Sequence, residues 1–357
     1  MTISHGVRSH GVRSHGVRRT LGALGAAVLG LGLLPGLPAS AWAAAAYRPA
    51  DNGARIVGQR QVDASRLEIT VRSPAVGRDL KATVLVPKGW RRNAKRTWPT
   101  VYMYGGGGGD DHTTWIKQTG LAALARKWDT LVVLPYAGSF GGYVNHFNYG
   151  RRGKPRWETH HTVELTQLVE RNLRAGSRRA VMGISAGALG AMTYAGHKPG
   201  LFKYVAAFSG VLHISRPGVP AILMAINARS NQGDPFNIWG VPGVHEANWK
   251  AHDPYELAPR LRGTKLYISS GTTGERGPLD PKNLSEEEAT RLRILGGLSE
   301  QLTGEASKSF TTRLRQLKIP VTTHFYGNGW HAWPYWNREM RRAWPTAMKT
   351  IGAKQIT

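Results

Sequence analysis

Apolar residues along the chain form short runs that are separated by polar or glycine-rich stretches. Such runs are typical of strands that are buried on both faces of a parallel sheet. The runs that predict strands are residues 66–71, 82–86, 100–104, 130–134, 180–182, 204–208, 265–270 and 321–325. Stretches with helical character lie between many of them: 113–127, 161–173, 188–195, 284–317 and 337–350. This alternation predicts an α/β fold with a mostly parallel central sheet flanked by helices.

Two stretches depart from the alternation. Residues 211–260 are rich in Pro, Gly and Trp and have little periodicity, which indicates an excursion over an active site. Residues 88–99 form a basic loop that contains Trp90 and Trp98. This loop is either a solvated hairpin connection or a contact for anionic lipid or glycan.

The segment Gly183-Ile184-Ser185-Ala186-Gly187 follows one of the apolar runs and precedes a helical stretch. Strand, sharp turn and helix are the context of a G-x-S-x-G nucleophile elbow. The turn holds the serine in a strained backbone conformation, and side chains at either glycine would collide where strand and helix approach. The sequence therefore predicts Ser185 as a nucleophile, with free N–H groups at the start of the helix for an oxyanion.

A run of glycines begins at Gly105, directly after the predicted strand 100–104. Glycines in this place let backbone N–H groups approach a substrate oxygen, so Gly106 and Gly107 are candidates for an oxyanion hole. A phosphate-binding loop is the alternative, but no Gly-Lys-Ser/Thr follows.

An acid and a base are predicted after the last two strands. Glu275 follows the strand 265–270, with Asp280 and Asp253 as alternatives, and His331 follows the strand 321–325. Serine, acid and histidine in that order are the arrangement of an α/β-hydrolase. His331 would accept the Ser185 proton, and Glu275 would hold the imidazole ring.

Composition narrows the chemistry and suggests a partner. The chain of 357 residues has no cysteine, which excludes disulfides, thiolate catalysis and cysteine metal sites. Its formal charge of +26 predicts adhesion to polyanions such as a cell-wall polymer or an anionic membrane, unless the charge is only a solvated surface. No metal, organic cofactor or specific nucleic acid is expected.

The first 43 residues have the features of a secretory signal peptide: a basic start, an apolar Gly- and Ala-rich run and small-x-small cleavage sites. We expect a secreted protein with one catalytic domain over residues 44–357, and Arg18-Arg19 permits twin-arginine as well as Sec export. The signal peptide holds four arginines and no other charged residue, so cleavage lowers the charge from +26 to +22.

With these motifs in place, the chain resembles the antigen 85 (mycolyltransferase) branch of the secreted esterases. The matching pieces are Val101-Tyr102, Asp110-Asp111, Trp115, Trp157-Glu158-Thr159, Gly183 to Ala186, Phe202, Ser209-Gly210, Trp239-Gly240, Asp253-Pro254 and His331 to Trp336. The resemblance implies an α/β-hydrolase fold and acyl transfer through an acyl-serine. It also implies an oxyanion hole from the N–H of Ala186 and of Gly106 or Gly107, and an acceptor site flanked by Trp333.

Two departures bear on the substrate. The mycolyltransferases have Asp-Gly-Leu-Arg where this chain has only glycines from Gly105, and a serine where this chain has Ala332. The sequence thus favours a serine esterase or acyltransferase acting on acyl esters, lipid or glycolipid among them. Mycolyl transfer to trehalose or a cell-wall sugar is one alternative, and a non-catalytic protein that binds polyanions or the cell wall is the other.

Overall fold

The computed structural model describes residues 47–107, 111–136, 138, 143–151, 153–229 and 233–356. The predicted signal peptide, Gly108, Gly109 and Asp110 lie outside the described residues. The described residues all belong to one compact unit. Within this part of the chain, no helix is long and apolar enough to cross a membrane.

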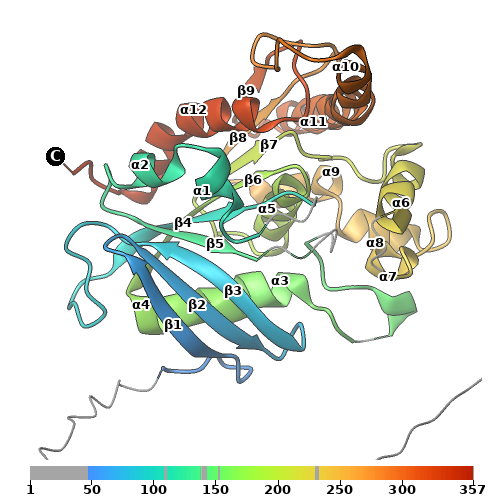
Figure 1. Cartoon of the computed structure of the whole chain (residues 1–357). Helices are drawn as coiled ribbons and strands as arrows, with labels where there is room; N and C mark the ends of the chain where they lie inside the picture. The colour runs from blue at the N-terminus through green and yellow to red at the C-terminus, as the bar shows by residue number, and fades with distance from the viewer. Residues whose placement is uncertain are drawn as a thin grey trace, which may run out of the picture. The chain divides into compact units, whose positions relative to one another are not determined.

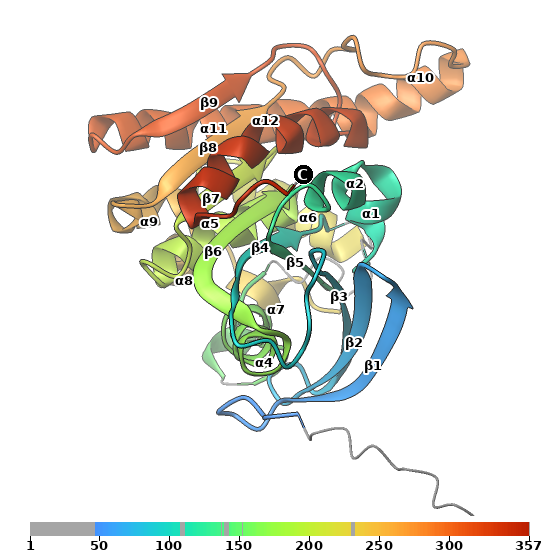
Figure 2. The ribbon, with the colours of Figure 1, turned by 90° about the vertical axis from the view of Figure 1, so that its left-hand side faces the viewer.

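The described residues contain a nine-stranded sheet with the order β1-β2-β3-β5-β4-β6-β7-β8-β9. The strands are β1 Arg55–Asp63, β2 Arg66–Ser73, β3 Arg78–Leu85, β4 Trp98–Tyr104, β5 Leu131–Pro135, β6 Ala175–Ile184, β7 Tyr204–Phe208, β8 Lys265–Ser270 and β9 Val321–Phe325. Strand β1 pairs antiparallel with β2, β2 with β3, and β3 with β5. Every pair from β5 onward in the sheet order, through β4, β6, β7, β8 and β9, is parallel. Figures 1 and 2 show the blue antiparallel strands and the red β9 at opposite edges.

Helices cover both faces of the parallel part of the sheet. They are α1 Thr114–Gln118, α2 Leu121–Ala125, α3 Trp157–Thr159, α4 Thr166–Leu173, α5 Ala186–His197, α6 Val219–Arg229, α7 Phe236–Trp239, α8 Glu246–Ala251, α9 Pro254–Leu257, α10 Glu286–Leu292, α11 Leu298–Gln316 and α12 Trp333–Ile351. Two π-helical segments, η2 His160–Leu165 and η4 Arg293–Gly297, lead into α4 and α11. Short 3-10 segments are η1 Asn148–Gly150 and η3 Ala258–Leu261.

The two faces of β4 show why its sequence is apolar except at Thr100. Tyr102 and Tyr104 belong to the core on the side of α4, α5 and α11, whereas Val101 and Met103 belong to the core on the side of α2 and α12. Successive side chains of a strand point to opposite faces, so a strand covered on both sides needs apolar residues at every position. This explains the continuous apolar runs of the sequence.

The structure changes some of the predicted elements. Strand β1 has no apolar run because it lies at the edge of the sheet and most of its side chains are exposed. The predicted helix 113–127 is divided into α1 and α2, and the predicted helical stretch 284–317 is divided into α10, η4 and α11. The excursion 211–260 contains the short helices α6 to α9.

Candidate active site

The predicted elbow forms at the carboxyl end of β6. Ser185 lies between β6 and α5 with φ of 51° and ψ of −119°, a strained conformation for a residue with a side chain. Its N–H donates to the carbonyl oxygen of Phe208 at 2.9 Å, which ties the turn to β7. The turn therefore positions the serine hydroxyl at the end of the sheet.

The glycines of the elbow allow a close approach of backbone to backbone. A Cβ atom on Gly183 would lie 2.2 Å from the carbonyl oxygen of Gly187. A Cβ atom on Gly187 would lie 2.3 Å from the carbonyl oxygen of Gly105, in the loop that leaves β4. The steric need for both glycines, predicted from the sequence, is confirmed.

His331 lies on the loop between β9 and α12. Its N–H donates to the carbonyl oxygen of Gly296 at 3.2 Å, and the edge of its ring faces Trp336 with 4.9 Å between ring centroids. The Nδ1 atom lies 2.7 Å from Oε2 of Glu300. A carboxylate only accepts hydrogen bonds, so Nδ1 carries the proton, and in the neutral ring Nε2 is left as an acceptor.

Glu300 is a fully buried carboxylate on α11, with an exposed fraction of 0%. Its Oε1 atom accepts hydrogen bonds from four donors: Ser209 Oγ at 2.8 Å, Ser270 Oγ at 3.1 Å, the Gly271 N–H at 2.6 Å and the Tyr326 hydroxyl at 2.8 Å. A buried charge is tolerated only when its oxygens are satisfied in this way. Burial and the neighbouring carboxylate raise the pKa of the Tyr326 hydroxyl, so that it stays a donor.

The acid beside His331 is therefore Glu300 and not the predicted Glu275. The Glu275 side chain is exposed and forms no hydrogen bond or ion pair with His331 among the described residues. The carbonyl oxygen of Glu275 accepts the Gly329 N–H at 2.8 Å. The acid comes from α11 because this helix packs closely on the end of β8. A Cβ atom on Gly304 would lie 2.3 Å from the carbonyl oxygen of Gly271.

The two alternative acids have structural partners elsewhere. Asp280 Oδ2 accepts the Gly277 N–H at 2.8 Å, the Trp330 N–H at 3.1 Å and the Tyr335 hydroxyl at 3.1 Å. These hydrogen bonds stabilise the loop that carries His331. Asp253 caps α9 and accepts from Ser215 Oγ at 2.6 Å. Neither carboxylate has a hydrogen bond to His331 among the described residues.

The sequence contains a signal for Glu300 in the helical spacing of buried residues, but other acidic residues nearby make this signal hard to recognise. The buried positions of α11 include Thr303, Gly304, Ser307, Phe310, Thr311 and Leu314. Glu300 lies in phase with this stripe at helical spacing, whereas nearby Glu286, Glu287 and Glu288 are exposed. A lone acid on the buried stripe of a helix indicates a paired or functional carboxylate.

The remaining predicted site residues divide into two groups. Gly107 and Ala186 line a cavity together with Ser185 and His331, and Gly106 is buried beside Gly107. Ala186 begins α5, so its N–H has no acceptor within the helix. Trp333 does not line this cavity; it is half-buried at the start of α12, edge-on to Trp115 and Trp336 at 5.3 Å and 5.1 Å between ring centroids.

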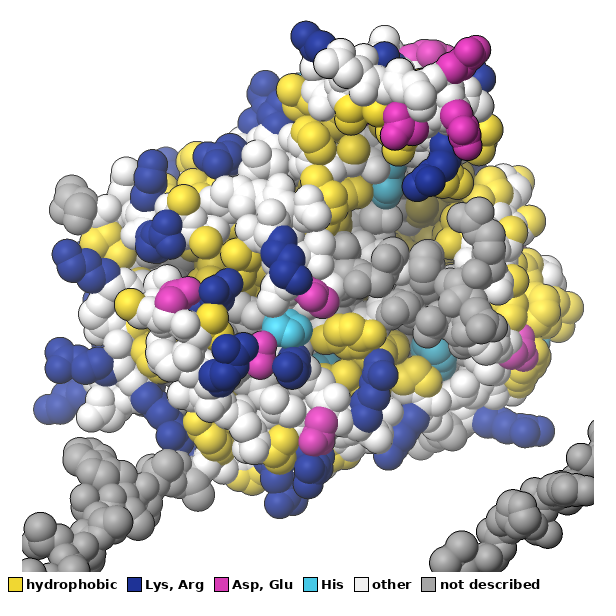
Figure 3. All heavy atoms as spheres, in the orientation of Figure 1, with side chains coloured by type: hydrophobic (Ala, Val, Ile, Leu, Met, Phe, Trp, Pro, Cys, Tyr) yellow, Lys and Arg dark blue, Asp and Glu magenta, His cyan; other side chains and the backbone are white. Residues whose placement is uncertain are grey.

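The cavity has a volume of about 310 Å³ and is mainly apolar. Leu189, Leu223, Ile226, Trp239, Leu295 and Leu302 contribute its apolar lining. A second hollow of about 670 Å³ shares Ile226, Leu295 and Leu302 with the cavity and continues outward between α6 and α11. Exposed apolar residues border it, with Ile222 43% exposed and Leu298 61% exposed. Figure 3 shows apolar side chains gathered toward α10 and toward α6 to α8.

The sheet order, the strained serine after the sixth strand and the histidine after the last strand are those of an α/β-hydrolase. The chain belongs to the Esterase family, whose model matches residues 73–347. It is an antigen 85-like member of that family, as the comparisons with individual proteins show, and the predicted fold class is confirmed.

The curated relatives are distant in sequence. Esterase Rv1288 of Mycobacterium tuberculosis is 26% identical over 276 residues, which are 76% of this chain and 57% of that protein. The chain thus spans little more than half the length of the first curated relatives that it matches. The Diacylglycerol acyltransferase/mycolyltransferase Ag85A of Mycobacterium leprae is 26% identical over 304 residues, which are 80% of this chain and 83% of that protein.

Solved structures share the fold. MPT51 (FbpC1) of Mycobacterium tuberculosis superposes with a TM-score of 0.62 at 22% identity, over 78% of this chain and 95% of that one. An S-formylglutathione hydrolase from Agrobacterium tumefaciens superposes with a TM-score of 0.61 at 17% identity, over 83% of this chain and 99% of that one.

Proposed function

We propose that this protein is a secreted serine esterase or acyltransferase that acts through an acyl-serine intermediate. The observation that carries the proposal is His331, held by a buried carboxylate and bordering the same cavity as a serine on a strained elbow. A strained serine, a base and an orienting acid are the parts that nucleophilic acyl transfer requires.

The reaction begins when Ser185 Oγ attacks the ester carbonyl and transfers its proton to His331 Nε2. Glu300 keeps the proton on Nδ1 and stabilises the imidazolium that forms. The negative charge on the carbonyl oxygen meets the N–H of Ala186 and that of Gly106 or Gly107. The imidazolium then protonates the leaving alcohol, and an acyl-serine remains.

Water or a second alcohol resolves the acyl-serine by the same steps in reverse. His331 takes the proton of the incoming hydroxyl, the acyl group moves to that oxygen, and Ser185 regains its proton. Transfer to an alcohol is supported by the relative of Mycobacterium leprae that is named an acyltransferase. No structural observation favours trehalose as the acceptor.

The apolar cavity and the hollow beyond it favour acyl esters with a chain of several carbons. The part of the cavity away from Ser185 has aliphatic side chains from α6 and α11, and each buried methylene of a substrate contributes about 0.8 kcal/mol. We expect the kcat/KM for p-nitrophenyl esters to rise from acetate to octanoate. Leu302→Trp fills the junction of cavity and hollow, so it should abolish that rise, whereas Val57→Trp on β1 should leave it unchanged.

The first experiment measures hydrolysis of p-nitrophenyl butyrate and labelling by a fluorophosphonate, read by mass spectrometry. The purified protein should hydrolyse the ester and carry the label on Ser185, and Ser185→Ala should lose both. Added glycerol or trehalose then shows whether an alcohol competes with water. An intact, folded protein without activity and without label would refute the acyl-serine mechanism.

A further inference from the structure

A separate pocket lies at the opposite end of the sheet from Ser185. It is about 760 Å³ in volume and is lined by the loop before β4 and by the C-terminal tail: Lys88, Gly89, Arg91, Asn93, Ala94, Lys95, Arg96, Trp98, Asp129, Lys354, Gln355 and Ile356. Trp98 is the first residue of β4, and the loop that meets the elbow follows its last residue, Tyr104. A strand rises about 3.3 Å per residue, so roughly 20 Å separates the pocket from the elbow.

The pocket is strongly basic. Five of its lining residues are Lys or Arg, and Asp129 is its one acid. The Asp129 carboxylate is already engaged, because it forms an ion pair with Arg96 and accepts the Trp98 indole N–H at 2.7 Å. It therefore neutralises Arg96, and no other acid among the described lining residues balances the remaining cations.

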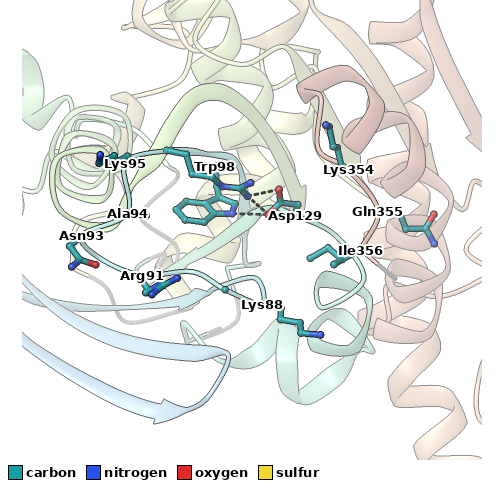
Figure 4. A pocket seen from close by; sticks show the side chains of 12 residues that line it. Lys88, Arg91, Asn93, Ala94, Lys95, Trp98, Asp129, Lys354, Gln355 and Ile356 are labelled. Atoms are coloured by element: carbon teal, nitrogen blue, oxygen red, sulfur yellow. Dashed lines mark hydrogen bonds and ion pairs between the residues drawn. The ribbon is translucent and has the colours of Figure 1, made fainter.

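Four cations of the pocket have no partner among the residues that the structure describes. The side chains of Lys88, Arg91, Lys95 and Lys354 make no hydrogen bond or ion pair with any described residue. Figure 4 shows these four side chains on different sides of the pocket, with Trp98 and Asp129 between them. In Figure 3, Lys and Arg side chains (dark blue) also gather at the left of the molecule, where Figure 1 places the C-terminus. Repulsion between unpaired cations is unfavourable, so their arrangement indicates a site for anions.

The walls of the pocket are fixed by main-chain contacts. The Asp129 N–H donates to the carbonyl oxygen of Lys354 at 2.8 Å, and the Ile356 N–H donates to that of Lys127 at 2.8 Å. The guanidinium of Arg96 stacks on the Trp98 ring at 4.4 Å from its centroid. The tail and the loop are thus held in place before any ligand arrives, which reduces the entropy lost on binding.

We propose that this pocket binds a polymer with repeating phosphate groups and thereby anchors the protein, while the cavity beside Ser185 stays open at the other end of the sheet. Three of the four unpaired cations are lysines, whose compact ammonium groups suit phosphate as point charges. The cations are spread around a pocket far larger than one phosphate, so successive groups of one chain satisfy them. The shared chemistry fits inorganic polyphosphate and poly(glycerol phosphate) alike, and this inference does not depend on the catalytic proposal.

The test measures binding of the purified protein to fluorescent inorganic polyphosphate by anisotropy over a series of NaCl concentrations. The pocket variant is Lys88→Gln/Arg91→Gln/Lys95→Gln. The control variant Lys203→Gln/Lys308→Gln/Arg315→Gln removes the same charge from exposed positions elsewhere. The pocket variant should bind at least tenfold more weakly and reduce the slope of log K against log salt by about 2 to 3, since each lost phosphate contact lowers it by about 1. Far-UV circular dichroism and a thermal melt check that both variants are folded.

The outcomes separate the explanations. Weakened binding in the pocket variant alone supports the site, and a parallel measurement with poly(glycerol phosphate) shows which polymer it prefers. Equal loss in both triple variants would show a diffuse charge effect and overturn the proposal. Equally tight, pocket-dependent binding of polygalacturonate, a carboxylate polymer, would overturn the assignment to phosphate.

Discussion

Replacing Glu300 by glutamine tests which carboxylate orients His331. The carboxylate binds its partners unequally, because Oε1 accepts four hydrogen bonds and Oε2 faces His331 Nδ1 at 2.7 Å. In Glu300→Gln the four donors require the amide oxygen at the Oε1 position. The amide NH₂ group is then forced to face Nδ1.

An NH₂ group facing Nδ1 reverses the histidine tautomer. Nδ1 becomes the acceptor, so the ring proton moves to Nε2, and Nε2 can no longer accept the proton of Ser185. A wrong tautomer of this kind in a serine triad lowers kcat by about 10⁴-fold, and we expect a loss of about 10³ to 10⁴-fold here. In free energy of activation this is about 4 to 5.5 kcal/mol.

The assay is kcat and kcat/KM for p-nitrophenyl butyrate with Glu275→Gln as the matched control. The Glu275 side chain is exposed, so this control should stay within about twofold of the wild type. Circular dichroism confirms that Glu300→Gln is folded, since a neutral amide forms weaker hydrogen bonds to the four donors. A folded Glu300→Gln within tenfold of the wild type, or a thousandfold loss in Glu275→Gln, would refute the assignment.

Two further predictions concern stability. Gly187→Ala should lower the free energy of unfolding by about 1–3 kcal/mol and abolish esterase activity, because the added Cβ would collide with Gly105. In the control Gly58→Ala the added Cβ would have its nearest neighbour 3.5 Å away, so a thermal melt should show that this change is tolerated. Burial alone would raise the pKa of Glu164, but hydrogen bonds from His160, Ser73, Ala75 and Asn52 outweigh it and lower the pKa from 4.5 to about 2. Its contribution, of about 3 kcal/mol, is present above pH 5 and is lost as the pH falls toward 2. In urea unfolding, the difference between wild type and Glu164→Gln should therefore shrink over that range, and a constant difference would contradict it.

The parts of the site that depend on local backbone geometry were predictable from the sequence. The elbow needs glycines at positions 183 and 187, and position 187 also lies close to Gly105. These steric requirements appear in the sequence as the G-x-S-x-G motif. His331 was found by its place after the last strand. In both cases the side chain lies where a parallel strand ends, and the ends of strands are visible as the ends of apolar runs.

The acid was not predictable in the same way, because its position depends on packing between distant segments. Glu300 reaches His331 only because α11 lies against the carboxyl end of β8, where Gly304 meets Gly271. The stretch 284–317 was predicted as one charged helical region, whereas the structure has the π-helical segment η4 before α11. Glu275 satisfied the order of the residues but not this packing.

The position of Glu300 also shows what the fold requires of an acid that pairs with His331. The elbow and the histidine loop are each fixed by strands, so Ser185 and His331 can lie in few places. The acid has only to present a buried oxygen to Nδ1, and here α11, packed on the end of β8, supplies it. The four donors on Oε1 come from the ends of β7, β8 and β9: Ser209, Ser270, Gly271 and Tyr326. The sheet thus provides the polar environment that makes a buried carboxylate stable, and the helix provides the carboxylate.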